Sequence, residues 1–262
     1  MIRSIMRLLS AHVALLAAFA HGTVPGDLEI VASLMARGDL SDRSFDASEA
    51  LKDYLNAEKI APANVPLLMR IARQYRHLMS DANTSEMKLK LGHLSLSYAL
   101  RAAALAPSDS EAQLSPAITY GKMLSYQTSK QQRDEASLIK TAADKALKLD
   151  PLNDNAWHVL GRWHQGLASV GMLKRTIGSV IYGSLPSSTY AEAIRCFDKA
   201  IAINPNRLRH HIELGKTYAL MGNSVAARRY LEKGIGMPNT EKDDPELKAR
   251  GREALATLPK AL

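Results

Sequence analysis

The feature that most constrains the fold is a proline that recurs after similar alanine-rich phrases. Pro107, Pro151, Pro205 and Pro238 close the segments SLSYALRAAALAP, IKTAADKALKLDP, AIRCFDKAIAINP and ARRYLEKGIGMP. Each segment is amphipathic at helical spacing, and a proline just beyond a helix stops it because the ring cannot continue the hydrogen-bond ladder. Self-similarity of this kind predicts an array of helical repeats.

The repeats follow the tetratricopeptide pattern, which spaces Trp, Leu, Gly and Tyr along one helix and Ala, Phe and Pro along the next. The matching residues are Trp157, Leu160 and Gly161, with His164 at the tyrosine position; Ala193, Phe197, Ala200 and Pro205; and Leu214, Gly215, Tyr218 and Ala227. Two earlier units are degenerate, with Ile71, Ala72 and Tyr75 leading to Pro107, and Tyr120, Gly121 and Leu124 leading to Pro151.

The predicted fold is therefore all-α: a tetratricopeptide-like helical-repeat array, or α-α superhelix, of about four helix pairs over residues 63–238. We expect a helical or linker region over 27–62 and a C-terminal capping helix over 239–262. About twenty extra residues, 169–188, interrupt the third unit. Their apolar residues recur at helical spacing, which favours one inserted apolar helix packed against the array; a lid or a membrane contact is the alternative.

Within the repeat, Trp157 and Leu160 are expected to fill the space between helices, and small residues let the helices approach. His158 and His164 are six residues apart, about 600° around a helix, so they point to different sides and cannot chelate one metal ion from one helix. Cys196, the only cysteine, is expected to be a small apolar filler, and no internal disulfide can form.

Charge biases the choice of partner. The formal net charge is +8 and the pI is about 9.5, which favours nucleic acid, acidic lipid headgroups or acidic protein tails. No basic face carries stacking aromatic residues, so we expect no nucleic-acid partner. The sequence contains no phosphate-binding glycine loop, serine-nucleophile elbow or paired-histidine zinc motif. We therefore predict a binding protein with no catalytic residue, cofactor or metal.

The N-terminal segment has a different character. Residues 1–26 contain Arg3 and Arg7 but no Asp or Glu, and the apolar run Leu8–Ala20 is shorter than the roughly 20 residues that span a bilayer. A mitochondrial presequence, a secretory signal and a helical anchor lying against a membrane all fit. From this segment we expect a location at the mitochondrion, with the secretory pathway as the remaining alternative.

One stretch is more specific than the general repeat pattern, and it resembles the regulators of microtubule dynamics. Its matching residues are Trp157, His158, Leu160, Gly161, Arg162 and Trp163; Gly183, Pro186, Ser188 and Thr189; and Glu192, Ala193, Phe197, Lys199 and Ala200. The resemblance covers roughly residues 45–260. It implies a helical adaptor associated with microtubules or spindle poles, and with it a location in the cytoplasm or at the cytoskeleton. Some relatives sit at mitochondria or their contacts with endoplasmic reticulum, where the repeat domain can bind phospholipid.

Setting the four units in register shows two rows on the face expected to be concave. The residue after the small eighth position is always basic: Arg73, Lys122, Arg162 and Lys216. One turn earlier stand mostly apolar residues: Met69, Ile118, His158 and Ile212. Residues four apart share a helix face, so these rows predict a groove for an amphiphile with an anionic head or an acidic peptide with apolar anchors. The alternative is that the basic residues are solvated or pair with neighbouring acids.

A second basic patch falls on the last unit. It comprises Arg207, Arg209, Arg228, Arg229 and Lys233. The candidate partners are therefore proteins, including tubulin with its acidic tails, and anionic phospholipid, with membrane association through the N-terminus. A solvated helix face is the alternative for this patch.

Overall fold

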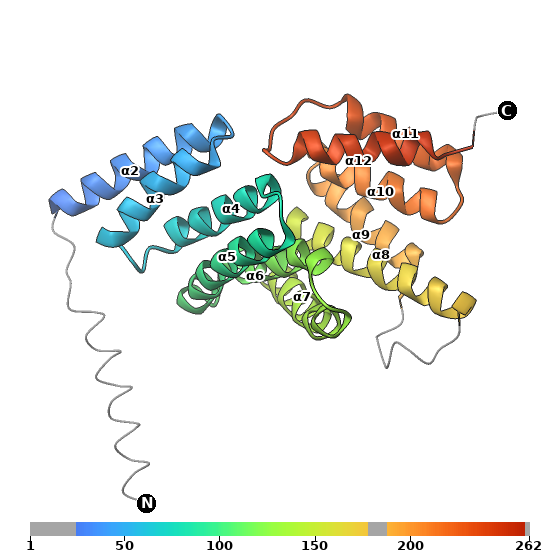
Figure 1. Ribbon diagram of the computed structural model, residues 1–262, viewed down its shortest axis with the longest axis horizontal. Helices are drawn as coiled ribbons and strands as arrows, with labels where there is room; N and C mark the ends of the chain where they lie inside the picture. Colours follow the sequence, from blue (N-terminus) through green and yellow to red (C-terminus); the bar gives the residue numbers. More distant parts are fainter. Residues whose placement is uncertain (1–24, 178–187, 260–262) are drawn as a thin grey trace, which may run out of the picture.

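The computed structural model describes residues 25–177 and 188–259. Within them the chain forms 11 α-helices, one short 3-10 helix and no strand, which confirms the predicted all-α class (Figure 1). The elements are α2 (Pro25–Arg43), α3 (Ala47–Ile60), α4 (Val65–Asp81), α5 (Ser85–Leu105), α6 (Ser110–Met123), η1 (Leu124–Tyr126), α7 (Ser129–Leu149), α8 (Asp154–Ile177), α9 (Tyr190–Ile203), α10 (Leu208–Leu220), α11 (Ser224–Gly236) and α12 (Asp244–Ala256).

Consecutive helices pack as hairpins, and each hairpin packs on the next, as in stacked repeats (Figure 1). The pairs are α2–α3, α4–α5, α6–α7, α8–α9 and α10–α11, with α12 packed on α10 and α11. A buried cluster around Tyr54 joins α2, α3 and α4. The stacking therefore begins one helix pair before the units that match the repeat pattern.

The second helix of each repeat ends where the recurring prolines predict. Each of Pro107, Pro151, Pro205 and Pro238 lies two residues beyond the last residue of its helix, where proline cannot continue the hydrogen-bond ladder. A capping box starts α9: the Thr189 hydroxyl accepts from the Glu192 N–H, and the Glu192 carboxylate accepts from the Thr189 N–H.

Small residues let paired helices approach at the eighth position of each first helix. These positions are Ala72 in α4, Ala117 in α6, Gly161 in α8 and Gly215 in α10. A Cβ at Gly161 would lie 2.6 Å from the Phe197 ring, and one at Gly215 would lie 2.7 Å from Leu231. The predicted register of the second unit is wrong, since Gly121 is exposed and has nothing within 4 Å of its Cβ position. It lies one helical turn too late, and the buried small residue is Ala117.

The apolar core is a series of clusters along the array. Leu160 is buried as predicted, but Trp163 is the more buried of the two tryptophans, at 8% exposure. Its indole N–H donates to the Ala136 carbonyl at 2.8 Å. Trp157 is only partly buried, and its indole N–H donates to the Pro151 carbonyl at 2.9 Å. Its amphipathic ring therefore covers the edge of the cluster.

Two predicted segments lie largely beyond these residues. The N-terminal segment 1–26 is outside apart from its last two residues, and the insert 169–188 begins within α8 but is described only to Ile177 and again from Ser188. Among the described helices, none is both long and apolar enough to cross a membrane.

Candidate ligand-binding site

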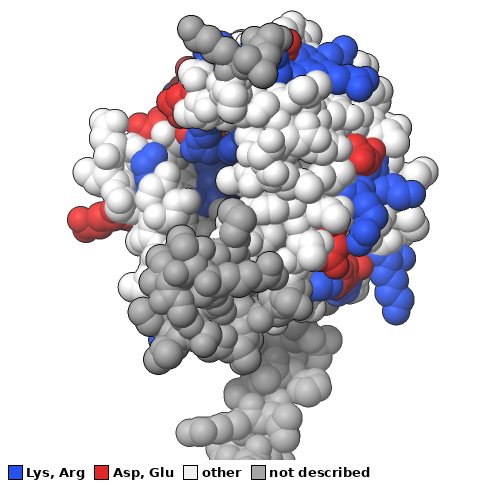
Figure 2. All heavy atoms as spheres, turned by 90° about the vertical axis from the view of Figure 1, so that its right-hand side faces the viewer, with Lys and Arg blue, Asp and Glu red and all other residues white. Residues whose placement is uncertain are grey.

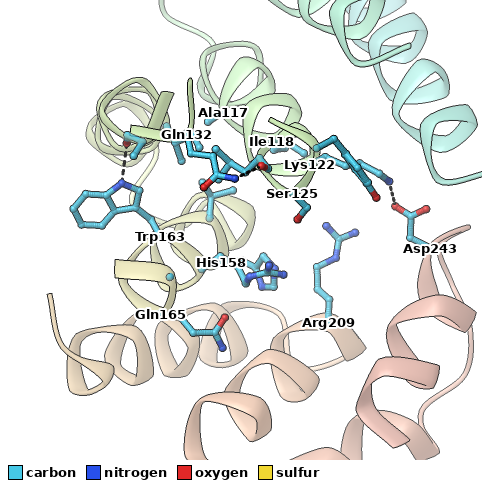
Figure 3. A pocket seen from close by; sticks show the side chains of 18 of the residues that line it. Ala117, Ile118, Lys122, Ser125, Gln132, His158, Trp163, Gln165, Arg209 and Asp243 are labelled. Atoms are coloured by element: carbon cyan, nitrogen blue, oxygen red, sulfur yellow. Dashed lines mark hydrogen bonds and ion pairs between the residues drawn. The ribbon is translucent and has the colours of Figure 1, made fainter. Parts of the chain in front are cut away.

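A pocket of about 510 Å³ opens on the concave side of the array (Figure 3). This volume falls in the range of roughly 300–1,000 Å³ that is common for small-ligand sites. Its walls come mainly from α6, α7 and α8, and α10 and α12 close it on the far side. A recess floored by Lys and Arg side chains is visible on the face turned to the viewer in Figure 2.

One part of the pocket wall is apolar. Its side chains come from α6, η1, α7 and α8: Ile118, Leu124, Tyr126, Ala136, Ile139, Val159, Trp163, Leu167 and Val170. In Figure 3, Trp163 lies at one end of the pocket, away from Lys122, Arg209 and Asp243. An elongated ligand with an apolar end and an anionic end would match this separation.

The other end of the pocket is cationic. Lys122 from α6 and Arg209 from α10 both line it. Burial lowers the pKa of Lys122, and burial together with the charge of Arg207 lowers the pKa of Arg209 to about 10. Arg209 therefore keeps its positive charge at neutral pH, in surroundings where water screens that charge less than at an open surface.

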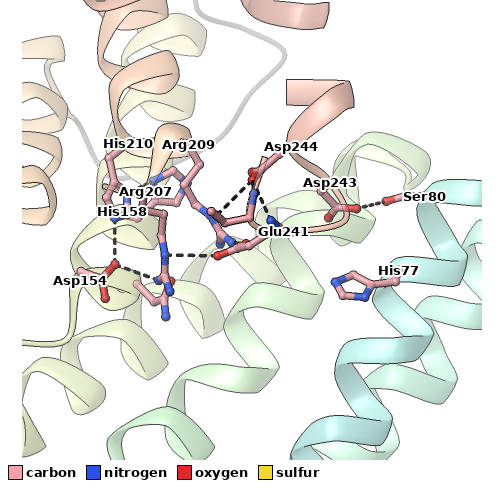
Figure 4. A network of polar contacts seen from close by, with 12 residues as sticks. His77, Ser80, Asp154, His158, Arg207, Arg209, His210, Glu241, Asp243 and Asp244 are labelled. Carbon is pink, nitrogen blue, oxygen red and sulfur yellow. Dashed lines mark hydrogen bonds and ion pairs between the residues drawn. The ribbon is translucent and has the colours of Figure 1, made fainter. Parts of the chain in front are cut away.

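An acidic turn, residues 241–243, meets this cationic end (Figure 4). Asp243 accepts from the Lys122 ammonium at 2.6 Å and from the Ser80 hydroxyl at 3.0 Å. Glu241 pairs with Arg207 at 3.2 Å and also with Arg209. The turn thus joins the C-terminal cap to helices more than a hundred residues earlier in the chain.

A chain of hydrogen bonds runs from the pocket into the array (Figure 4). The ring nitrogen Nδ1 of His158 lies 3.0 Å from Nδ1 of His210, and Nε2 of His210 lies 2.9 Å from Asp154. Because the carboxylate accepts from His210, neutral His210 accepts in turn from His158. Burial and the charge of nearby groups hold the pKa of His158 well below its usual range, so this pocket-lining imidazole is neutral at pH 7.

The four residues of the predicted basic row are not brought into one site. Lys122 and Arg162 line the pocket, whereas Arg73 and Lys216 do not. All four pair with carboxylates, which agrees with the alternative that these basic residues pair with neighbouring acids. The pairs are Arg73 with Asp42, Lys122 with Asp243, and both Arg162 and Lys216 with Glu213, at 3.1 and 2.9 Å.

Glu213 explains why two of those cations are held at the array wall. Its side chain is almost fully buried. Burial by itself would raise the pKa of Glu213, but the charges of Arg162 and Lys216 outweigh that effect and lower it. Arg162 remains 45% exposed in spite of this pair, so its guanidinium can still meet a ligand in the pocket.

The predicted apolar row is divided in the same way. Ile118 and His158 line the pocket. Ile212 is fully buried in a core cluster with Leu208 and Leu231, and Met69 is half-buried outside the pocket wall. The shift of one turn in the second unit placed Ile118 in this row, and Leu114 occupies the equivalent fifth position of α6.

The second basic patch separates into two groups. Arg207 and Arg209 turn inward to Glu241, and Arg207 also pairs with Asp154 at 2.9 Å. Arg229 and Lys233 lie exposed on α11, and half-buried Arg228 donates to the Pro259 carbonyl at 3.1 Å. The group on α11 is therefore a surface feature, and of the inward-turned pair only Arg209 lines the pocket.

Arg76 is a half-buried cation between α4 and α6 that the predicted rows do not include. It follows Arg73 by three residues, so it shares a face of α4 with it. Its guanidinium donates only to the hydroxyls of Ser115 and Thr119, at 3.4 and 3.2 Å, and no carboxylate of the described residues lies within 4.0 Å. Helical spacing from Arg73 is the signal that could have identified it.

The same residues also bear on metal binding and nucleophilic chemistry. Across residues 25–177 and 188–259, no group of three or more His, Cys, Asp or Glu side chains is arranged to hold a metal ion. Cys196 is buried, as predicted, and burial raises the pKa of its thiol to about 11. A thiol of that pKa is not a nucleophile at neutral pH. His164 turns away from His158 and meets the Ser188 hydroxyl at 2.5 Å.

The fold and the pocket together define a helical-repeat protein of the tetratricopeptide class. A solved structure of a thermophilic TPR protein from Thermus thermophilus shares this fold, with a TM-score of 0.59 and 15% sequence identity over 86% of this chain and 99% of that chain. At this level of identity the likeness concerns the fold alone.

The chain belongs to the regulator of microtubule dynamics family. The family profile, described as Regulator of microtubule dynamics protein 1-3, matches residues 34–259. Protein 1 of Mus musculus is 33% identical over 194 residues, which cover 73% of this chain and 64% of the mouse protein. The Bos taurus protein 1 is 29% identical over 82% of this chain and 69% of its own length. The Caenorhabditis elegans protein 1 is 26% identical over 79% of this chain and 92% of its own length.

Proposed function

We propose that this chain is a non-enzymatic scaffold associated with microtubules, whose pocket captures an acidic segment of a protein partner. The observation that carries the proposal is the pairing, in one pocket, of an apolar wall around Trp163 with the cations Lys122, Arg162 and Arg209. Such a pocket suits a peptide that combines carboxylates with apolar anchors. The names of the relatives point to microtubules, and tubulin tails supply acidic segments of this kind.

Charge outside the pocket supports the same class of partner. Arg229 and Lys233 are exposed on α11, and the net charge is +8. A positive surface raises the rate at which an acidic polymer is captured, and this effect fades as salt shortens the Debye length to about 8 Å at physiological ionic strength. The α11 patch would make the first contact, and the pocket would then select the segment.

Co-sedimentation with polymerised tubulin tests this proposal. We expect the chain to pellet with microtubules at low salt and to be released at moderate salt. In the double variant K122Q/R162Q the affinity should fall about tenfold, or about 1.4 kcal/mol, because the cationic end of the pocket is reduced. The control K52Q/K59Q loses the same charge from exposed positions on α3. Absence of pelleting at low salt, or equal loss in the control, would contradict the proposal.

Phospholipid is a second candidate ligand, favoured by the size and apolar wall of the pocket. About 510 Å³ beside Lys122 and Arg209 suits part of an acyl chain with its anionic headgroup at the cationic end. The array would then act as a lipid-binding, transfer or tethering module at mitochondria or their contacts with endoplasmic reticulum. Residues 1–26 would hold the chain at a membrane.

Native mass spectrometry of the chain purified from cells tests the lipid candidate. We expect one phospholipid per chain in the unaltered protein and loss of that mass in A136W, because Ala136 lines the pocket and the indole would fill it. S137W is the matched control, since Ser137 is the adjacent residue on α7 and its side chain is exposed. Recovery of lipid-free protein, or equal lipid in A136W and S137W, would count against this candidate.

A further inference from the structure

The acidic turn occupies the cationic end of the pocket in the way a bound peptide would. Glu241 contacts Arg207 and Arg209, and Asp243 contacts Lys122 and Ser80. The two carboxylates belong to residues two apart, and each meets a different part of the site (Figure 4). Glu241 and Asp243 reach different donors of the site although only Lys242 separates them in the turn, so the site accommodates two carboxylates with one residue between them.

The turn is also supported by contacts within its own segment, apart from its ion pairs with the site. Asp244 is 1% exposed, and its carboxylate accepts from the backbone N–H groups of Thr240 and Glu241, each at 2.8 Å. The helix that follows packs Leu247 and Leu255 into the cluster around Leu208 and Ile212. Glu241 and Asp243 can therefore leave the cations by side-chain rotation while the backbone of the turn stays in place.

The turn fills the site only in part. The Nε atom of Arg209 is buried, and among the described residues it has no hydrogen-bond partner. Arg76 meets only hydroxyl groups, and Arg209 lies near enough to lower the pKa of Arg76. The contacts that exist are also partly open to water, with the side chains of Lys122 and Asp243 exposed by 23% and 32%. The Arg209 Nε–H group is therefore an unused donor, and Glu241 and Asp243 are held in the site by ion pairs and a hydrogen bond.

We infer that the acidic turn is an internal occupant of a site that receives, in trans, a protein segment with two carboxylates one residue apart. This inference rests on the proposed function and narrows the partner to segments of the type Glu/Asp-x-Glu/Asp. The turn competes with such a segment, so without a partner the scaffold presents a site whose cations are only partly neutralised. An acidic partner gains by replacing Glu241 and Asp243 and by meeting the unused donor of Arg209.

Removing the internal carboxylates tests the inference. In E241Q/D243N, a fluorescein-labelled peptide in which glutamates alternate with glycines should bind about tenfold tighter, measured by fluorescence anisotropy at low salt. The control E232Q/E253Q loses the same two charges from exposed positions on α11 and α12. Adding R209Q to E241Q/D243N should abolish the gain. Circular dichroism at 222 nm checks that every variant keeps its helicity.

Three outcomes would overturn the inference. One is equal affinity in E241Q/D243N and in E232Q/E253Q. Another is an equal gain for a peptide of the same composition with its glutamates grouped together. The third is a gain for vesicles containing phosphatidylserine with none for the alternating peptide. The microtubule assay is scored separately: pelleting that K122Q/R162Q weakens, with no peptide gain in E241Q/D243N, would remove this inference and leave the proposed function standing.

Discussion

Replacing Phe197 with alanine is expected to lower the free energy of unfolding by about 3–5 kcal/mol. The Phe197 ring is fully buried in a cluster with Ala193 and Leu214. It also fills the space left by Gly161, where a Cβ would lie 2.6 Å from the ring. The contact joins α8 to α9, so the cavity would open beside α8, one of the helices that line the pocket. The whole free energy of unfolding of a typical domain is about 5–15 kcal/mol.

Urea unfolding followed by circular dichroism at 222 nm measures this change. The control is L105A, since Leu105 is 50% exposed on α5 and substitutions at such sites usually change stability by less than about 0.5 kcal/mol. A loss below about 1 kcal/mol for F197A, or the same loss for L105A, would mean that α8 and α9 do not pack around this ring.

Acidification is expected to destabilise the array from about pH 6.5 downward, before its carboxylates titrate. Burial, with His210 and the arginines at 162, 207 and 209, holds the pKa of His158 well below its usual range, and burial lowers the pKa of His77 to about 3. Below pH 6.5 these two histidines bind protons in the unfolded chain but stay neutral in the folded protein. Stability is therefore lost as pH falls, by about 1.4 kcal/mol per pH unit for each histidine.

Urea midpoints measured between pH 6.5 and 5 check this prediction. In H158N the dependence of stability on pH should be weaker by the contribution of one histidine. An asparagine amide can still donate to His210, but it does not titrate in this range. The control H93Q removes an exposed histidine of α5 and should leave the slope unchanged. An H158N slope equal to that of the unaltered chain would refute the assignment of the pH dependence to His158.

The helix pairs could be predicted because their signals are local. The proline stops depend on residues close together in the chain, and the structure confirms them. The register of α6 could not be predicted in the same way. Gly121 and Ala117 are four residues apart, so they share a helix face. Only burial tells them apart: Ala117 is fully buried and Gly121 is exposed.

The site was predicted in part, for a related reason. Arg162 and His158 line the pocket because the concave face of a repeat helix follows from its period. Lys122 and Ile118 also line it, although the register predicted for α6 is wrong, because an error of one turn keeps the same helix face. Arg73 does not, since Asp42 of α2 pairs with it. That pair depends on how a helix pair outside the recognised repeats packs onto α4, and no pattern within the units reports it.

Local spacing determined the helices, their ends, the stacking class and the family to which the chain belongs. Each of these depends on residues within a turn or two, or on a repeated phrase. The tertiary structure alone decided which cations share a pocket and which carboxylates reach them. Asp243 meets Lys122 across 121 positions of sequence, because the curvature of the stacked hairpins brings the C-terminal turn to α4 and α6. The curvature is the sum of small rotations between successive hairpins, and no short stretch of the sequence reports that sum.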